Sequence, residues 1–213
     1  MTIEQRSEEW HRQRAGKITA SRFEDAISMK LVGREPNKVL VPTDTRSTYM
    51  REIVAAILSG EPKAEINSYS LQWGKDTEPY ARQAYEIETG HVVTEAEFIL
   101  HPVHDFIGCS PDGLVGADGG IEMKCPKDPG VHIKTLAEGM PEEHAGQVQG
   151  CMFVTGRKWW DFVSYDPRTD EPYRLYIQRI ERDELYIQRL ESGLWKFWQD
   201  VQSYLELIKR KVA

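Results

Sequence analysis

Apolar residues recur with a helical period over much of the first ninety positions of the chain. This period predicts helices over residues 46–59 and 68–89, and the glycine that directly follows each segment is typical of a helix end. Ser21 and Glu24 have the spacing of a capping box, which predicts a short helix with Ser21 as its N-cap. Residues 29–44 are rich in turn formers, so we expect a loop there.

The pattern changes after residue 90 to short apolar runs separated by turn formers. These runs predict three consecutive strands, at residues 91–100, 104–116 and 120–126. Residues 117–120 read Ala-Asp-Gly-Gly, a composition that favours a tight hairpin turn between the last two strands. We therefore expect the centre of the chain to form a sheet.

The last part of the chain combines helical and strand patterns. A helix is predicted over 141–155, because a proline stands in its first turn. Strands are predicted over 158–166 and 171–180, and a long amphipathic helix over 182–211. Together these elements predict one α/β domain over residues 1–213, with a central mixed sheet flanked by helices.

The composition is that of an ordinary soluble globular protein, with 40% hydrophobic and 29% charged residues. No apolar run is long enough to cross a bilayer and no signal-peptide pattern opens the chain, so we expect a cytoplasmic protein. The net charge of −7 argues against a protein that coats nucleic acid. A slight excess of basic residues near the start still leaves room for a locally basic channel.

The cysteines and histidines indicate neither disulfides nor a metal site. The three cysteines, Cys109, Cys125 and Cys151, are odd in number and include no C-x-x-C pair, so we expect reduced thiols. His101 and His104 flank a proline, which favours a surface loop over a metal-binding pair.

Asp112, Glu122 and Lys124 stand on the apolar runs on either side of the predicted hairpin turn. Glu122 and Lys124 are two apart in a strand, so they share a face, and Asp112 can approach the same point from across the hairpin. Two carboxylates held together repel each other, and a hard divalent cation removes that cost. The sequence thus predicts an Mg²⁺ site at Asp112 and Glu122, with Lys124 positioned to activate water. The alternative is a solvated hairpin with a surface Glu–Lys pair.

Further candidates lie outside the hairpin. Glu78 could be a third acid at the site, or a solvent-facing glutamate of its helix. Gln147 could face the site, or be a routine polar position. Arg14 can grip a phosphate with two hydrogen bonds, and Ser21 at a helix N-terminus would favour an anion. These two residues suggest a phosphate pocket; the alternative is an exposed basic segment with an ordinary cap.

The motifs, in this order, resemble the lambda exonuclease family of phage recombination nucleases, within the PD-(D/E)xK superfamily. The superfamily triad alone is a loose motif, whereas the full set is specific. The resemblance implies a restriction-endonuclease-like core, and it is weak over 29–66 and after residue 180. The matching stretches are WHRQRAGKITAS (10–21), LQWGKDTEPYAR (71–82), CSPDGL (109–114), IEMKCP (121–126), AGQVQ (145–149) and YDPR (165–168).

The resemblance implies a metal-dependent 5′-3′ exonuclease. Such an enzyme digests one strand of linear double-stranded DNA to mononucleotides and leaves a 3′ single strand for recombination by strand annealing. Asp112 and Glu122 match the family's Mg²⁺ ligands, with two ions expected and Mn²⁺ as a substitute. Lys124 matches its catalytic lysine, and Glu78 matches the helical acid near the metals.

The resemblance also assigns residues to the DNA end. Arg14, Ser21, Ser110 and Gln147 match residues that hold the 5′-phosphate of the strand being cut. Leu71 falls where the family has an apolar wedge that helps to split the end of the duplex. His144 stands where lambda exonuclease has a tyrosine, so that contact is not carried over.

The family's members look like ring-shaped homotrimers that pass the surviving strand to a single-strand annealing protein. We therefore expect three kinds of partner: two further copies of this chain, a single-strand annealing protein and the end of a DNA duplex. Two other functions remain open from the residues alone. One is a site-specific endonuclease built on the same metal site, and the other is a DNA-binding subunit without catalysis.

Overall fold

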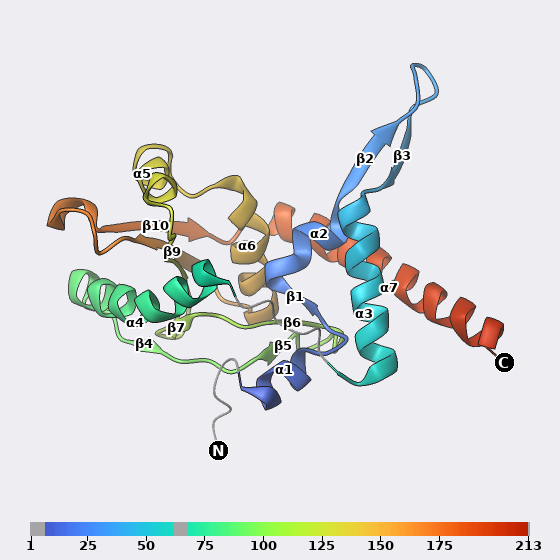
Figure 1. Cartoon of the computed structure of the whole chain (residues 1–213), viewed down its shortest axis with the longest axis horizontal. Coiled ribbons are helices and arrows are strands. Elements are labelled where there is room, and N and C mark those ends of the chain that lie inside the picture. The colour runs from blue at the N-terminus through green and yellow to red at the C-terminus, as the bar shows by residue number, and fades with distance from the viewer. Residues whose placement is uncertain (1–6, 62–67, 213) are drawn as a thin grey trace.

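A five-stranded mixed sheet forms the core layer of one half of the protein (Figure 1). The computed structural model describes residues 7–61 and 68–212. Strands β8 and β9 run parallel, and the other neighbouring pairs of this sheet are antiparallel. The order of the strands is β10 (Leu175–Glu181), β9 (Trp159–Tyr165), β8 (Gly119–Lys124), β7 (Gly113–Val115) and β4 (Val93–Thr94).

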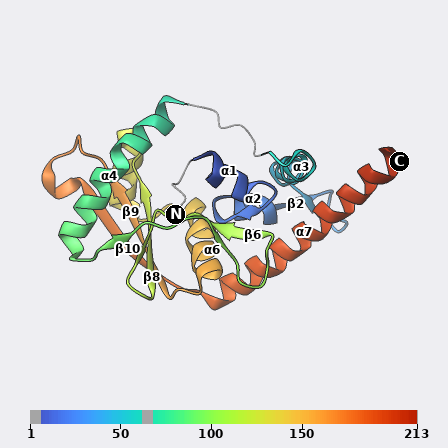
Figure 2. The same ribbon diagram turned by 90° about the horizontal axis from the view of Figure 1, so that it is seen from below.

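Helices α4 (Tyr69–Thr89) and α6 (Ala145–Thr155) cover opposite faces of this sheet (Figure 2). On the α4 face, Tyr85 packs with Ile121 and Met123 of β8 in a small buried cluster. On the α6 face, the fully buried Trp160 belongs to the main hydrophobic core. Because strand side chains alternate, Glu122 and Lys124 point away from the α4 cluster.

The rest of the chain builds a mainly helical half around a small second sheet. Three short strands form that sheet in the order β1 (Ile18–Thr19), β6 (Ile107–Cys109), β5 (Ile99–Leu100). The main core joins it to the helices that surround it. The helices are α1 (Glu8–Arg14), α2 (Phe23–Ile27), α3 (Asp44–Ser59) and the long α7 (Glu184–Val212), with α5 (Pro129–Glu138) beside the large sheet.

The predicted mixed α/β architecture is confirmed, and so are its longer helices. Segments 46–59, 68–89, 141–155 and 182–211 correspond to α3, α4, α6 and α7, although a 3₁₀ turn forms the start of the third. The predicted hairpin turn joins β7 to β8. No helix of the described residues has the length and apolar character needed to span a membrane.

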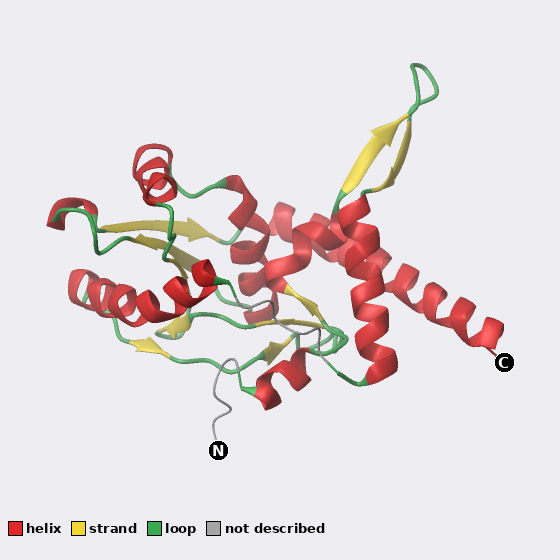
Figure 3. Cartoon of the chain, in the orientation of Figure 1, coloured by secondary structure: helices red, strands yellow, loops and turns green. Residues whose placement is uncertain are grey.

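The expected loop at 29–44 is wrong. Strands β2 (Met29–Val32) and β3 (Val39–Pro42) pair there as an antiparallel hairpin that projects from the body of the protein (Figure 3). Most of the turn formers that suggested a loop lie at its tip, between Val32 and Val39, where Gly33 has a positive φ. The apolar runs on both sides are the strands, and Leu31 and Leu40 are 64% and 60% exposed.

Two predicted strands are each divided between two sheets. The segment 104–116 forms β6 and β7, because Pro111 between them cannot donate to a strand ladder. The segment 91–100 forms β4 and β5, which pair with β7 and β6 respectively and so follow the same division.

Two smaller predictions also need correction, and one helix was not predicted. Ser21 is not an N-cap: it lies inside a 3₁₀ helix, Ala20–Arg22, that has no side-chain cap. The strand predicted from residue 171 begins at Leu175, because Glu171–Tyr173 form another 3₁₀ turn. Helix α5 was not predicted, although Asp128 caps it and Pro129 opens it, a recognisable start signal.

Candidate active site

Glu122 and Lys124 form a close ion pair on the α6 face of β8. The Glu122 side chain is almost completely buried, and the Lys124 ammonium donates to its Oε1. Lys124 Nζ also lies 3.3 Å from Gln147 Oε1 of α6. The sheet and the helix that covers it therefore both position this lysine.

Asp112 joins the pair through the backbone of the same strand. Its Oδ2 accepts a 2.6 Å hydrogen bond from the Met123 N–H, between Glu122 and Lys124. Its own carbonyl oxygen accepts from Arg82 of α4 at 3.1 Å. The hairpin thus brings Asp112, Glu122 and Lys124 together, as the sequence predicted, and excludes a solvated surface pair.

Burial and neighbouring charges both shift the pKa values of the cluster. Burial raises the pKa of Asp112 well above its usual range, and the nearby carboxylates of Glu122 and Glu78 raise it further. Burial alone would lower the pKa of Lys124, but the carboxylates of Glu122 and Asp112 outweigh burial and raise it. The lysine is therefore held in its charged form by the two acids.

The cluster also contains a buried oxygen that lacks a protein partner. Among the described residues, no donor reaches Glu122 Oε2, although a buried acceptor left unsatisfied is costly. No three His, Cys, Asp or Glu side chains in this part of the chain are grouped so that they could hold a metal by themselves. Mg²⁺ commonly takes only one or two carboxylates and completes its shell with water and substrate oxygens. Asp112 and Glu122 fit such a cation.

Glu78 stands beside this cluster on α4. Its side chain is only 17% exposed, and its Oε1 lies 4.0 Å from Arg82 Nη2, one helical turn further on. Its effect on the pKa of Asp112 places its charge close to the carboxylates. The alternative of a solvent-facing glutamate does not hold.

Four of the predicted DNA-binding residues line one cavity of about 130 Å³. Arg14 Nη1 donates to Ser110 Oγ at 2.8 Å, and the guanidinium lies 4.1 Å from the centre of the Trp10 ring. Two residues link this cavity to the acidic cluster. Asp112 belongs to both, and Gln147 lines the cavity and also accepts a hydrogen bond from Lys124. Its walls are formed by Trp10, Arg14, Thr19, Ala20, Ser21, Ser110, Asp112, Gln147 and Cys151.

Ser21 contributes to this cavity in a way that differs from the prediction. Its hydroxyl lies 3.4 Å from that of Thr19, and Ser21 stands inside the 3₁₀ helix Ala20–Arg22 rather than at a helix N-cap. Leu71 does not line the cavity; it lies in the first turn of α4 and is 49% exposed.

Sequence reasoning gave no role to two polar residues near the acids and Lys124. Arg82 bonds to Asp112 and Glu95, and its position four residues after Glu78 is the helical spacing that could have indicated it. His144 lies over Phe162, where burial and the charge of Lys124 lower its pKa to about 4.

A mixed sheet flanked by helices, with two acids and a lysine at one point of a central hairpin, defines the class of restriction-endonuclease-like nucleases. The model of the YqaJ-like viral recombinase domain matches residues 9–158. The chain belongs to this family of phage-type exonucleases, and the resemblance to the lambda exonuclease family is confirmed.

Solved structures agree with the family match. The alkaline exonuclease LHK-Exo from Laribacter hongkongensis is 40% identical over 97% of this chain and 98% of that one, with a TM-score of 0.85. Its complex with dAMP gives a TM-score of 0.86. A phage-related exonuclease from Haemophilus somnus 129PT shares the fold, with 20% identity over 92% of this chain and 96% of that one and a TM-score of 0.66. No curated protein matches the sequence.

Proposed function

We propose that the protein is a metal-dependent 5′-3′ exonuclease that digests one strand of linear double-stranded DNA to mononucleotides. The observation that supports this proposal is the cavity that contains Arg14 and Ser110 and shares Asp112 with the acidic cluster. A terminal 5′-phosphate bound in the cavity would bring the first phosphodiester linkage to the carboxylates. Family membership supports the coarser statement that the chain is a nuclease acting on DNA.

The residues of the site have distinct roles in this proposal. Asp112 and Glu122 would hold two Mg²⁺ ions, or Mn²⁺ in their place, and bound metal supplies charge neutralisation and an acidified water. Arg14 and Ser110 bind the terminal phosphate through charge-assisted hydrogen bonds. Lys124 pairs with Glu122 and lies 3.3 Å from Gln147, so it is placed to orient the attacking water or to help deprotonate it.

A 5′-phosphate bound in this cavity would also explain the proposed direction of digestion. Each cut creates a new 5′-phosphate on the shortened strand, and the empty cavity can bind that group again. Binding energy at a non-reacting group thereby positions the next reacting linkage. LHK-Exo was solved with dAMP, a nucleoside monophosphate of the kind that this reaction would release.

The test is digestion of linear duplex DNA that carries a 5′-phosphate on one strand only. With Mg²⁺, the phosphorylated strand should disappear first and nucleoside 5′-monophosphates should accumulate, and a chelator should stop both. Cleavage of closed circular duplex would instead identify an endonuclease. Loss of the strand from its 3′ end would refute the proposed polarity.

The proposal extends to the partners that the family resemblance implies. We propose a ring-shaped homotrimer in the cytoplasm that passes its 3′-ended strand to a single-strand annealing protein. A closed ring around DNA would give processivity by topology, so a strongly basic surface would be unnecessary. The net charge of −7 is compatible with that arrangement.

A further inference from the structure

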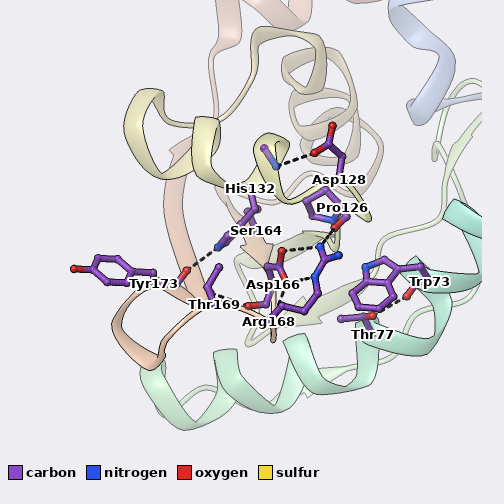
Figure 4. Close-up of polar contacts among 11 residues, drawn as sticks. Trp73, Thr77, Pro126, Asp128, His132, Ser164, Asp166, Arg168, Thr169 and Tyr173 are labelled. Atoms are coloured by element: carbon purple, nitrogen blue, oxygen red, sulfur yellow. Dashed lines mark hydrogen bonds and ion pairs between the residues drawn. The ribbon is translucent and has the colours of Figure 1, made fainter.

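A buried aspartate and a half-exposed arginine form a rigid pair in the turn after β9 (Figure 4). Asp166 is fully buried, and its two oxygens accept from Arg168 Nε at 2.8 Å and Nη2 at 2.7 Å. The Arg168 backbone N–H adds a third bond to the same carboxylate, at 3.0 Å. A two-pronged pair of this kind fixes the plane of the guanidinium as well as its position.

The fixed guanidinium joins two segments that carry site residues. Arg168 Cζ lies 4.5 Å from the centre of the Trp73 ring of α4, and Nη2 lies 3.3 Å from the carbonyl oxygen of Pro126. Pro126 follows Lys124 at the end of the β8 strand. Trp73 stands on α4 between Leu71 and Glu78. Arg168 therefore connects the helical acid to the strand that holds the other charged groups.

A proline inside α4 explains why the first half of the helix needs support from Arg168. Pro79 directly follows Glu78 and lies in the interior of the helix. Proline has no N–H to donate to the preceding turn, so it weakens the continuity of a helix at that point. The first half of α4, which carries Leu71 and Glu78, consequently needs its own anchor. A second contact supports the same half, since Lys127 Nζ lies 3.6 Å from the centre of the Tyr69 ring.

We propose that Arg168, held by Asp166, is a positioning residue of the active site. It holds Trp73, and through it sets Glu78 and Leu71 relative to the carboxylates of the β8 hairpin. This inference rests on the proposed function, because the positions of Glu78 and Leu71 matter only if the protein cuts DNA.

The protein contains a matched control for this arrangement. Asp161 is buried and accepts two 2.9 Å hydrogen bonds from Arg179, whose guanidinium lies 3.6 Å from the centre of the Trp159 ring. Tyr85 of α4 donates to the same carboxylate at 2.7 Å, so this second unit anchors the other half of the helix. The side chains of Arg168 and Arg179 are 40% and 43% exposed.

The experiment compares Arg168→Lys with Arg179→Lys. Both keep the charge and lose the planar, two-pronged geometry, so both should lower the melting temperature to a similar extent. Arg168→Lys should lower kcat on 5′-phosphorylated duplex by about tenfold or more, because a small misplacement of a positioned group is costly. KM should change less than kcat, since Arg14 and Ser110, which would bind the terminal phosphate, lie on other segments. Arg179→Lys should keep the wild-type kcat.

Hydrogen exchange supplies a readout that does not depend on activity. Arg168→Lys should speed amide exchange in residues 69–78, and Arg179→Lys should speed it mainly in residues 80–89. Equal loss of kcat in both variants, or unchanged exchange in residues 69–78 of Arg168→Lys, would overturn the inference. If wild-type protein digests no DNA, the proposed function fails, and the exchange pattern alone then decides whether Arg168 positions the first half of α4.

Discussion

Single side chains explain how an apolar hairpin tolerates three charges. Lys124 pairs with Glu122, and the backbone of Met123 binds Asp112, so most of the charge is compensated within one strand. Glu122 Oε2 is the exception among the described residues, and the proposed cation would compensate it.

Asp112→Asn tests the role of charge at the proposed metal site. The amide keeps an oxygen that can accept from Met123 but removes the repulsion from Glu122 and Glu78. In chelator the variant should therefore melt at or above the wild-type temperature, while nuclease activity falls at least about a thousandfold. Added Mg²⁺ should raise the melting temperature of wild type only, because a ligand stabilises the state that binds it. A large destabilisation in chelator would contradict this account.

Arg14→Ala tests the phosphate cavity. Hydrogen bonds to a charged group contribute about 1.5–3 kcal/mol, so the preference for 5′-phosphorylated over 5′-hydroxyl ends should fall by about 10- to 100-fold. Arg12→Ala is the control, because Arg12 lies on the same helix but is 57% exposed and pairs with Glu8 and Glu9. Rates on the two kinds of end, measured for each variant, check the prediction. An Arg14→Ala enzyme with an unchanged preference would refute the cavity's role.

His144→Gln tests the effect of burial on pH dependence. The folded protein holds the pKa of His144 at about 4, below its ordinary 6.5, so between these values the unfolded chain binds a proton that the folded chain does not. The free energy of unfolding of the wild type should thus fall as the pH drops from 6.5 to 4. Allowing for solvent screening of this partly exposed side chain, the fall should exceed that of the variant by on the order of 1–2 kcal/mol. Denaturant melts between pH 7 and 4 measure the difference. His91→Gln, at an exposed position, should follow wild type.

The sequence predicted the parts of the site that depend on neighbouring residues, through strand alternation and the hairpin turn. Alternation along a strand places Glu122 and Lys124 on one face, and the hairpin turn brings Asp112 to them. The contact of Arg168 with Trp73 joins distant segments, so no local period indicates it. Ser21 was assigned to the cavity correctly but for the wrong physical reason, because it is not a helix cap.

At the scale of elements, the long helices followed from their sequence, whereas the division of two predicted strands between the sheets did not. The period of α4 or α7 is contained within the segment itself, and packing confirms it. The division of segments 91–100 and 104–116 depends on which strands pair, which is a property of the whole sheet. Similarly, the β2–β3 hairpin has no buried face, so its residues lack the alternation that identifies a half-buried strand.

Gly120→Ala tests the packing of β8 against β9. A Cβ at this position would come within 2.3 Å of the Trp160 ring, which is fully buried and cannot move aside. Overpacking of this kind costs about 1–3 kcal/mol of unfolding free energy. Gly74→Ala is the control, because nothing lies within 4 Å of its added methyl group and alanine favours the helix by about 1 kcal/mol. Chemical denaturation should move the two variants in opposite directions.

At the scale of the molecule, one chain presents the cavity and the acidic cluster together, and the proposed ring would only guide DNA to them. Light scattering during size-exclusion chromatography should give three times the 24.5 kDa mass of one chain. The trimer should persist at the concentrations at which long DNA is digested. A monomeric mass under those conditions, together with processive digestion, would contradict the proposed ring.

The β2–β3 hairpin has a further consequence for the isolated chain. In the part of the chain that the structure describes, its strands pair only with each other, so both outer edges keep unpaired backbone groups beside exposed Leu31 and Leu40. Open edges with apolar side chains are templates for strand addition and aggregation. An assembly that buries this hairpin would therefore also keep the protein soluble at high concentration. A chain whose hairpin stays exposed would tend to precipitate.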